Sequence, residues 1–445
     1  MTSRSDAARR DVASAPSLAP QRPTLTVVRR APYATNPVVG TKGRRAQQRI
    51  LEAALVAFGE LGYDQCNVAR ITALAGCSRA SFYQYFSGKE DVFRRLIGDA
   101  FAELIAATAS AGAIGGDVDG QQALCAWFDA YGQTYLRYRA VFAAFHGTAS
   151  ADPELILAAR QWSSHVNDAL RGRLGAVTAP GDVAGLALHF MPITALVAFD
   201  LANLLRYGPT AATIPSGRLT EALANTFHRV LFGVQTGVNA TSTRRPTLFV
   251  ADDTPIPAIP EPTDWSESRE AILDAALRAF TERGFHGTRI DDIAAQAGMS
   301  HGALYHYFPT KRDLFRLLGA RGALSFMGMF DELAAIDPSD PDCPAQLRSW
   351  VDEFARTHAE VGSLMRVWVD ALANGPELGQ DSGAVIRVIC GRIIQVLKRR
   401  PGGDAQVESL ILLALLTGMD LSKQDAGTVT RCTEVLGRGL LFLDG

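Results

Sequence analysis

Apolar residues recur along this chain at the three- and four-residue spacing of amphipathic helices. Phe128, Tyr131 and Tyr135 are one example of that spacing. The pattern is nearly continuous from about residue 41 to Val234, and it returns after a polar segment that is rich in proline. We find no convincing alternation of apolar and polar residues, which would indicate half-buried strands. We therefore predict an all-α protein whose helices pack their apolar faces together.

A stretch of about fifty residues occurs twice in the chain, at a fixed offset of 222 positions and without a gap. Between residues 49–96 and 271–318, 22 of 48 positions are identical. The repeat continues more weakly beyond this stretch, since Trp127 corresponds to Trp350 at an offset of 223. The chain is therefore predicted to contain two tandem units of about 200 residues each.

The conserved core of the two copies predicts a helix, a tight turn and a second short helix. It is the string Ile-x-Ala-x-Ala-Gly-x-Ser-x-x-x-x-Tyr-x-Tyr-Phe-x-x-Lys, which begins at Ile71 and again at Ile293. Glycine suits the turn because a left-handed backbone costs it little. The serine two residues later is a good N-cap for the second helix. This is the layout of a helix-turn-helix domain, whose second helix reads the major groove of DNA.

These observations divide the chain into six segments. Each unit consists of a head, which contains the helix-turn-helix, and an all-helical body. The predicted segments are a disordered basic tail (1–40), a first helix-turn-helix domain (41–96), a first helical ligand-binding and dimerisation domain (97–234), a proline-containing linker (235–264), a second helix-turn-helix domain (265–318) and a second helical ligand-binding and dimerisation domain (319–445).

In the first head, Phe82 and Phe86 lie four residues apart and are predicted to face the core, which turns the opposite face of the helix toward DNA. Arg79 can donate two hydrogen bonds to guanine, and Gln84 can pair with adenine. Tyrosine and lysine side chains nearby suit phosphate oxygens. The residues predicted to contact DNA are Arg44 and Arg45 in an arm that could enter the minor groove, Asn67 at a helix N-cap, Arg79, Ala80, Ser81, Tyr83, Gln84, Tyr85 and Lys89.

The second head offers a different surface at the same positions, with Leu304 and Phe308 predicted to face inward. Arg289 replaces the capping asparagine, and Thr288 beside it is expected to take over the cap. The sequences from Ser87 to Glu90 and from Thr310 to Asp313 fit capping boxes at the start of the next helix. The predicted DNA contacts of this head are Arg289, His301, Gly302, Ala303, Tyr305, His306, Tyr307 and Lys311.

Charge is distributed unevenly between the two heads, although the whole chain carries a net charge of only −2. Residues 1–40 carry six Arg and two Asp, and residues 41–97 carry nine Lys or Arg and five Asp or Glu, so each segment has a net charge of +4. Residues 264–320 carry seven basic and eight acidic residues, a net charge of −1. Because phosphate contacts dominate the affinity of DNA-binding proteins, the first head is expected to supply most of the affinity.

Both heads resemble the TetR family of bacterial transcriptional regulators, whose usual string is close to Gly-Tyr/Phe-x-x-Thr-Thr/Ser-Val-x-x-Ile-Ala-x-x-Ala-Gly-Val-Ser-x-Gly-x-Leu-Tyr-x-His-Phe-x-x-Lys. The departures are Ala80 for the usual glycine, Tyr85 and Tyr307 for the usual histidine, and Cys66 for a threonine. The resemblance implies that the tyrosine and lysine positions contact phosphate. It also implies that the body binds an apolar or amphipathic molecule and pairs with a second body.

Two such units in one chain imply an intramolecular pseudo-dimer that binds double-stranded DNA. Its recognition helices would lie about one DNA turn apart, roughly 34–36 Å. Because the two helices differ, the operator is expected to be asymmetric. Double-unit regulators of this kind are similar to those of lipid-uptake and lipid-metabolism operons, which suggests a repressor released by an acyl, sterol or CoA-linked effector. The predicted effector contacts are Trp127, Tyr131, Phe145, Trp162, His189 and Phe199.

Two alternatives remain open at this point. In one, the second head is vestigial, and the protein binds DNA only as a homodimer through its first head, with the second unit acting as a sensor or assembly module. In the other, Cys66 and Cys77 form a redox sensor. A further association of pseudo-dimers into a larger homodimer is also compatible with the sequence.

Other classes of function find little support in the sequence. There is no Gly-x-Ser-x-Gly elbow, phosphate-binding loop, Gly-x-Gly-x-x-Gly or His-Glu-x-x-His motif, so we expect neither an enzyme nor a bound cofactor or metal. The six cysteines form no Cys-x-x-Cys pair, and no secretory signal is visible, as expected for a cytoplasmic protein. The most apolar run, from Val183 to Leu205, contains Pro192 and Asp200 and is predicted to be a buried helix pair and not a membrane span.

Overall fold

A computed structural model describes residues 41–63, 65–149, 152–206, 213–233, 267–337, 340–372, 376–398, 403–418 and 426–441. The predicted tail (1–40) and linker (235–264) lie outside the described residues. The all-α prediction is confirmed within the described residues, where the only strand-like pairing is an isolated bridge between Ile114 and Leu174. Unit one consists of α1 (Thr41–Leu61), α2 (Val68–Ala75), α3 (Arg79–Tyr83), α4 (Lys89–Ala109), α5 (Val118–Ala149), α6 (Pro153–Arg171), α7 (Gly181–Leu204) and α8 (Ser216–Phe232).

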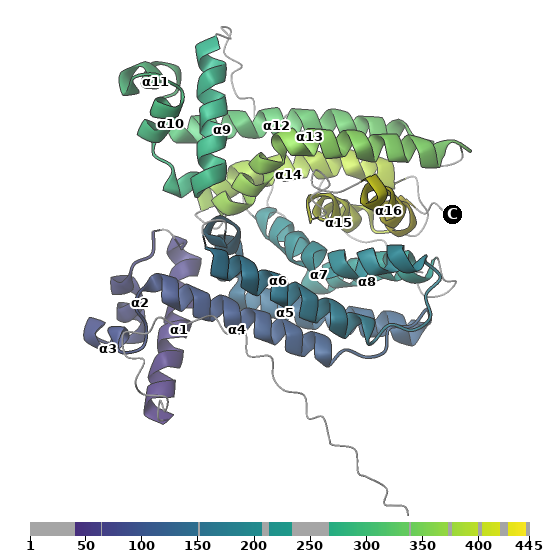
Figure 1. Ribbon diagram of the computed structural model, residues 1–445, viewed down its shortest axis with the longest axis horizontal. Helices are drawn as coiled ribbons and strands as arrows, with labels where there is room; N and C mark the ends of the chain where they lie inside the picture. The colour runs from purple at the N-terminus through teal and green to yellow at the C-terminus, as the bar shows by residue number, and fades with distance from the viewer. Residues whose placement is uncertain are drawn as a thin grey trace, which may run out of the picture.

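Unit two repeats this order with shorter helices at its end, as Figure 1 shows. Its elements are α9 (Glu267–Gly287), α10 (Ile290–Gln296), α11 (His301–Tyr307), α12 (Lys311–Ala335), α13 (Cys343–Leu372), α14 (Pro376–Leu397), α15 (Ala405–Gly418), α16 (Ala426–Leu436) and a π-helical turn, η2 (Gly437–Leu441). In each unit the first three helices form the head. The fourth helix, α4 or α12, runs without a break from the head into the body, so the predicted divisions after residues 96 and 318 fall inside helices.

The two bodies pack against each other through α7 and α8 of unit one and α15, α16 and η2 of unit two. The contact is mainly apolar, because every residue from Val407 to Leu416 in α15 is buried. Figure 1 shows the result: the bodies lie side by side, and both heads project from the same end of the pair. A single chain therefore forms a pair of bodies with two heads, an arrangement that would otherwise require two chains.

Salt bridges cross this interface at related positions in the two units. Arg218 in α8 donates two hydrogen bonds to Asp404, at 2.7 and 2.9 Å, just before α15 begins. Asp182, which corresponds to Asp404 at the offset of 222, lies 3.9 Å from Arg431 of α16. In each unit, an aspartate at the start of the corresponding helix, α7 or α15, thus pairs with an arginine of the other unit. The Arg218–Asp404 pair is the shorter of the two.

The most buried ion pair of the interface joins Arg229 in α8 to Glu408 in α15. The nitrogen-to-oxygen distance is 2.8 Å, and the side chains are only 3% and 2% exposed. Arg229 also donates to the carbonyl oxygen of Gly439 at 3.0 Å. The backbone comes close here, since a Cβ added at Gly439 would lie 2.7 Å from the side chain of Val230.

The apolar run that was predicted to form a helix pair is one continuous helix, α7. The prediction of two helices was wrong, because Pro192 lies within the helix without ending it. The prediction that the run is buried is confirmed for most of its side chains, which pack against α15, α16 and the rest of the body. In length and composition α7 is the one helix among the described residues that could cross a membrane, but 67% of its most apolar window is buried inside the protein, as in the core helix of a soluble protein.

Substituting one member of the buried pair should destabilise the joined bodies. Glu408→Ala leaves the Arg229 guanidinium buried without its carboxylate, which typically costs about 3–5 kcal/mol. The double variant Arg229→Met/Glu408→Leu removes both charges and should recover most of that loss. Glu60→Ala, which breaks an exposed pair with Arg70, is the control and should cost less than about 1 kcal/mol. Urea unfolding would measure all three, and equal losses for Glu408→Ala and Glu60→Ala would contradict this account.

Candidate nucleic-acid interface

The first head holds its recognition helix, α3, through a tight turn and a buried aromatic pair. Gly76 ends α2 in the left-handed region at φ 60°, and the Ser78 hydroxyl then accepts a hydrogen bond from the amide of Ser81 at 3.1 Å. Phe82 and Phe86 are 0% and 1% exposed, as predicted from their spacing. Burying this face fixes the rotation of the short helix and turns its other face toward solvent.

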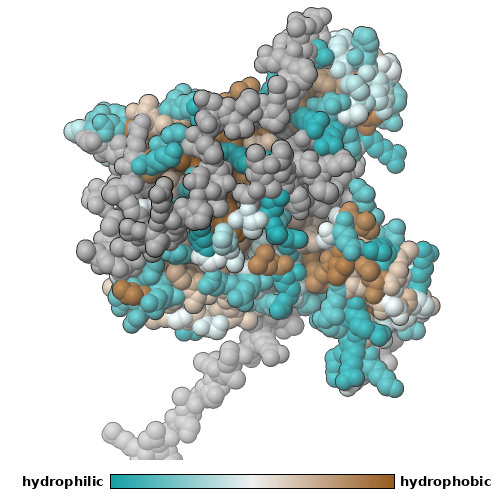
Figure 2. Space-filling view, turned by 180° about the vertical axis from the view of Figure 1, so that it is seen from behind, coloured by the Kyte–Doolittle hydropathy of each residue, from teal (hydrophilic) through white to brown (hydrophobic). Residues whose placement is uncertain are grey.

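The second head repeats this geometry with different side chains. Gly298 has φ 70°, and Ser300 caps α11 by accepting from the amide of Ala303 at 3.2 Å. Leu304 and Phe308 are buried, again as predicted. Both turns and both serine caps are therefore in place. Figure 2 shows hydrophilic side chains over much of the two heads at its right edge.

Most of the residues that were predicted to contact DNA are exposed on the two recognition helices. Tyr83 is 44% exposed and Tyr305 is 42% exposed, which is unusual for large apolar rings. Tyr85 and Tyr307 instead lie partly buried against the core. Ser81 is half-buried, and the remaining positions face solvent: Arg79, Ala80, Gln84, His301, Gly302, Ala303 and His306.

The structure corrects two predictions about helix capping. Asn67 caps α2 as predicted, accepting from the amide of Arg70 at 3.0 Å. Thr288 does not cap α10 in the second head, because its buried hydroxyl donates to the carbonyl oxygens of Ala279 and Gly284. The α10 N-terminus is stabilised instead by Asp292, which accepts from the amide of Arg289 at 3.0 Å.

The capping box predicted from Ser87 to Glu90 also forms differently. Asp91, and not Glu90, accepts from the amide of Ser87 at 3.0 Å, since Gly88 occupies the N-cap position and shifts the partner by one residue. The box predicted at Thr310 and Asp313 is confirmed in both directions, with hydrogen bonds of 3.1 and 3.2 Å.

Arg44 and Arg45 lie on the exposed side of the first turns of α1, which begins at Thr41. The description of these two residues as an arm was therefore wrong, because they lie within the first helix. Their contact with DNA stays a prediction. It would have to be made from a helix, and not from a flexible strand in the minor groove.

The lysine that ends the repeated string has a role within each head that the sequence did not reveal. Lys89 donates to the carbonyl oxygen of Tyr63 at 2.9 Å, and its ammonium lies 4.5 Å from the centre of that ring. Lys311 donates to the carbonyl oxygens of Phe285 and Thr288 at 2.8 and 2.9 Å. In both heads the ammonium therefore binds backbone oxygens at the C-terminal end of the first helix or just after it. Any phosphate contact by these lysines comes in addition to that role.

A carboxylate beside the recognition helix distinguishes the second head from the first. Asp291 in α10 lies 2.9 Å from His301 Nε2, and both side chains are exposed. The corresponding residues of the first head are Ala69 and Arg79. One head thus presents an exposed arginine at the start of its recognition helix, where the other presents a histidine paired with an acid. This difference agrees with the difference in net charge between the two heads.

Comparison with known proteins identifies both heads. The family described as bacterial regulatory proteins, tetR family, matches residues 50–96 and 272–318, which are the two copies of the repeat. Both heads belong to the TetR family. The family assignment agrees with the expectation that this protein is a regulator and not an enzyme.

Individual relatives match only part of the chain. The chain is 50% identical over 50 residues to the transcriptional regulator RutR of Escherichia coli K12, which covers 11% of this chain and 24% of RutR. It is 36% identical over 76 residues to the transcriptional repressor BepR of Brucella suis, covering 17% of this chain and 36% of BepR. It is 27% identical over 159 residues to the regulator BetI of Serratia proteamaculans, covering 34% of this chain and 78% of BetI. The chain thus spans about a quarter of the length of RutR.

Behind the first TetR head, the aromatic residues predicted to contact an effector mostly lie inside the body of unit one. Trp127 and Tyr131 are buried with ring centres 4.9 Å apart, and Phe199 stacks on Tyr135 at 5.2 Å. Trp162 stacks on Phe101 at 5.0 Å, with Phe145 against the same ring. His189 does not belong to this interior, because it is exposed on α7 and contacts Asn167 of α6 at 3.2 Å. Contact of His189 with an effector stays a prediction.

Polar groups are enclosed in this aromatic interior. The hydroxyls of Tyr131 and Thr194 and the indole nitrogen of Trp162 are buried without a hydrogen-bond partner among the described residues. Asp200 is also buried and accepts a 2.7 Å hydrogen bond from Tyr135. Burial raises the pKa of Asp200 to about 7, while the hydrogen bond from Tyr135 opposes the rise. The interior is therefore less uniformly apolar than its sequence suggested.

The cysteines named as a possible redox pair differ in their surroundings. Cys66 is buried, at 2% exposure, and burial raises the pKa of its thiol. Cys77 is half-buried at the edge of the same core. A reactive cysteine needs a lowered pKa and access to solvent, so Cys66 does not have the properties of a sensor.

The role of the conserved lysine within the head leads to a prediction about stability. Lys311→Met removes two charge-assisted hydrogen bonds and should destabilise head two by about 1–3 kcal/mol. Tyr305→Phe removes only an exposed hydroxyl and should change stability by less than about 0.5 kcal/mol. Hydrogen exchange of the backbone amides in 271–318 would measure both. Equal protection in the two variants would show that the lysine does not stabilise the head.

The raised pKa of Asp200 predicts a particular dependence of stability on pH. A buried acid with a folded-state pKa near 7, against 3.8 when unfolded, binds a proton more readily in the folded protein. Its contribution to stability is therefore lost as pH rises from about 4 to about 7. Relative to wild type, Asp200→Asn should become more stable by roughly 3 kcal/mol between pH 4.5 and pH 8. A stability difference that stays constant over that range in thermal unfolding would contradict the assignment.

Proposed function

We propose that this protein is a DNA-binding transcriptional regulator, acting as a repressor, in which one chain presents two unlike TetR heads to a single operator. The observation that carries the proposal is the arrangement in Figure 1, in which the paired bodies hold both heads at the same end of the molecule. Since the heads differ at the start of the recognition helix, the operator should consist of two unlike half-sites. A cytoplasmic location follows from this function.

The contribution of the two heads to affinity should be unequal. Arg79 is exposed at the first position of α3 and can donate two hydrogen bonds to a guanine. His301, at the same position of α11, is already engaged with Asp291. Tyr83 and Tyr305 are exposed on both helices and suit phosphate oxygens. Head one would then supply most of the affinity, and head two would add register and discrimination.

An effector bound inside the body of unit one would release the DNA. The buried aromatic interior, with its unpartnered hydroxyl and indole groups, suits a mostly apolar molecule that carries a few polar groups. An acyl, sterol or CoA-linked compound fits that description. Such an effector must bind more tightly to a body conformation that separates the heads, and bound DNA must then weaken effector binding by the same factor.

The alternative is that head two is vestigial and that two chains bind a palindrome through their first heads. The exposed carboxylate of Asp291 beside α11 favours this alternative, because it would repel phosphate. The helices and caps of head two are nevertheless complete, as expected if this head still binds DNA.

Matched substitutions in the two heads test the proposal. We expect Arg79→Ala to weaken binding to a selected operator by about 10- to 100-fold and His301→Ala by less than tenfold. Asp291→Asn preserves an acceptor for His301 but removes the charge, so it should strengthen DNA binding. The slope of log affinity against log salt concentration should steepen by about the amount of one phosphate contact. Fluorescence anisotropy at several salt concentrations would measure these effects. No response of affinity to either head-two variant would favour the vestigial alternative.

A further inference from the structure

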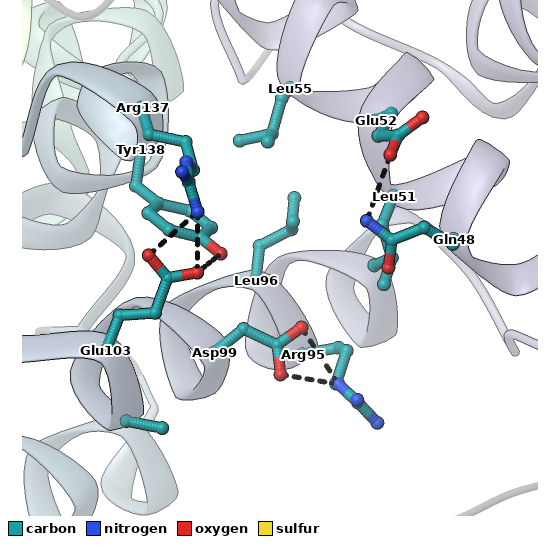
Figure 3. Close-up of a pocket in the computed structure, with 11 residues that line it drawn as sticks. Gln48, Leu51, Glu52, Leu55, Arg95, Leu96, Asp99, Glu103, Arg137 and Tyr138 are labelled. Atoms are coloured by element: carbon teal, nitrogen blue, oxygen red, sulfur yellow. Dashed lines mark hydrogen bonds and ion pairs between the residues drawn. The ribbon is translucent and has the colours of Figure 1, made fainter. Parts of the chain in front are cut away.

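A cavity of about 590 Å³ lies where head one meets its body, between α1, α4 and α5. This site is separate from the aromatic interior described above, because none of the predicted effector residues lines it. Figure 3 shows Leu55 of α1 and Leu96 of α4 directed into the space between the helices. The volume is within the range of about 300–1,000 Å³ that small-molecule sites occupy.

The walls of the cavity combine apolar and charged side chains. Leucine side chains from α1 and α4 form an apolar surface, and charged groups surround it. The lining residues are Gln48, Leu51, Glu52, Leu55, Arg95, Leu96, Asp99, Ala102, Glu103, Arg137 and Tyr138. Three carboxylates face two guanidinium groups in this set, so its net charge is −1.

Two of the three carboxylates are held by partners within the cavity (Figure 3). Glu103 accepts from Arg137 at 3.0 Å and from the Tyr138 hydroxyl at 2.8 Å. Asp99 accepts two hydrogen bonds from Arg95, at 2.8 and 3.0 Å.

Glu52 is bound differently from the other two carboxylates. Its carboxylate accepts from the neutral amide of Gln48, at 3.1 Å, and no cationic side chain among the described residues forms an ion pair with it. Glu52 is therefore the carboxylate that remains to bind a positively charged ligand at the edge of an apolar surface.

The second unit provides an internal comparison, because an ion pair at two of the same positions joins its head to its fourth helix. Gln48 and Asp99 correspond to Glu270 in α9 and Arg321 in α12 at the offset of 222. Arg321 donates two hydrogen bonds to Glu270, at 2.8 and 2.6 Å, which joins the first head helix to the fourth helix. This bidentate pair lowers the pKa of Glu270. In unit one, Gln48 donates to Glu52 within α1, and Asp99 accepts from Arg95 within α4, so the pair of unit two is replaced by bonds inside each helix.

We propose that the cavity at the head–body junction of unit one binds a small amphipathic organic cation. Its ammonium group would bind the Glu52 carboxylate, and its apolar part would lie against Leu51, Leu55 and Leu96. Because the walls belong to the head helix α1 and to the body helices, a bound molecule would set the angle between them. Binding itself does not depend on the proposed function, whereas its effect on DNA rests on it.

Three compounds with one carbon skeleton test the chemistry of the site. Isothermal titration of the full-length chain, without DNA, would compare 4-phenylbutylamine, which is a cation at pH 7, with 4-phenylbutan-1-ol and 4-phenylbutyrate. The amine should bind at least fivefold more tightly than the alcohol, and the carboxylate should bind most weakly. Equal affinities for the three compounds would overturn the proposal.

Two variants and one control locate the binding. Glu52→Gln should weaken the amine by about fivefold and leave the alcohol unchanged. Gln48→Glu/Asp99→Arg, which transplants the bridge of unit two, should abolish amine binding. Glu60→Gln removes an exposed carboxylate of α1 outside the cavity and should have no effect. Circular dichroism confirms that each variant folds. Amine binding that survives both cavity variants would place it elsewhere and refute the proposal.

A separate measurement distinguishes this proposal from the function proposed above. The affinity of the chain for its operator would be determined with and without saturating 4-phenylbutylamine. A change of at least threefold in wild type that disappears in Gln48→Glu/Asp99→Arg would link the cavity to the head. Loss of DNA binding in every sample would refute the proposed function but leave the titration result intact. Amine binding with no effect on the operator would refute the coupling of the cavity to the head.

Discussion

The burial of α7 against α15 is the interaction on which the rest of the structure depends. Both helices are apolar nearly all round, which requires cover on every side. Neither body can supply that cover alone, so the two bodies associate, and the ion pair of Arg229 with Glu408 fixes their register at the centre of the contact. The direction of the fourth helix in each unit then determines where the heads project. An apolar contact deep in the molecule therefore sets the positions of two exposed helices at its end.

Joining the units in one chain allows each half to diverge, which two identical subunits cannot do. The first head carries a net positive charge and an exposed Arg79, while the second carries the Asp291–His301 pair. The junctions have diverged as well, since Arg321 and Glu270 join head two to α12 where unit one has a cavity. The two heads therefore differ both in charge and in their connection to the body. Head one is basic and lies beside the cavity, whereas head two is near-neutral and is joined to α12 by the Arg321–Glu270 pair.

The sequence predicted those features that depend on local periodicity and on single turn residues. Phe82 and Phe86 were correctly assigned to the core, because four-residue spacing fixes one face of a helix. Gly76 and Gly298 were correctly assigned to turns, because few residues other than glycine adopt a left-handed backbone. The family itself followed from the repeated string.

The features that were missed depend on contacts between distant residues. The partner of Lys311 is a backbone oxygen 26 residues away, and a carbonyl group leaves no mark in a sequence. The exposure of His189 could not be predicted, because an apolar helix covered on nearly all sides gives no sign of its exposed positions. Thr288 was assigned to the wrong helix end, since a hydroxyl can donate to carbonyl groups as well as accept from amides.

The number of chains bound to one operator tests the central claim most directly. Native mass spectrometry of the full-length protein with a selected operator duplex would give this stoichiometry, and hydroxyl-radical footprinting of the same complex would give its symmetry. We expect one chain per duplex and two protected half-sites of unequal sequence. Two chains per duplex, with a palindromic footprint that is unchanged by Tyr305→Phe, would contradict the account of an intramolecular pair of DNA-binding heads.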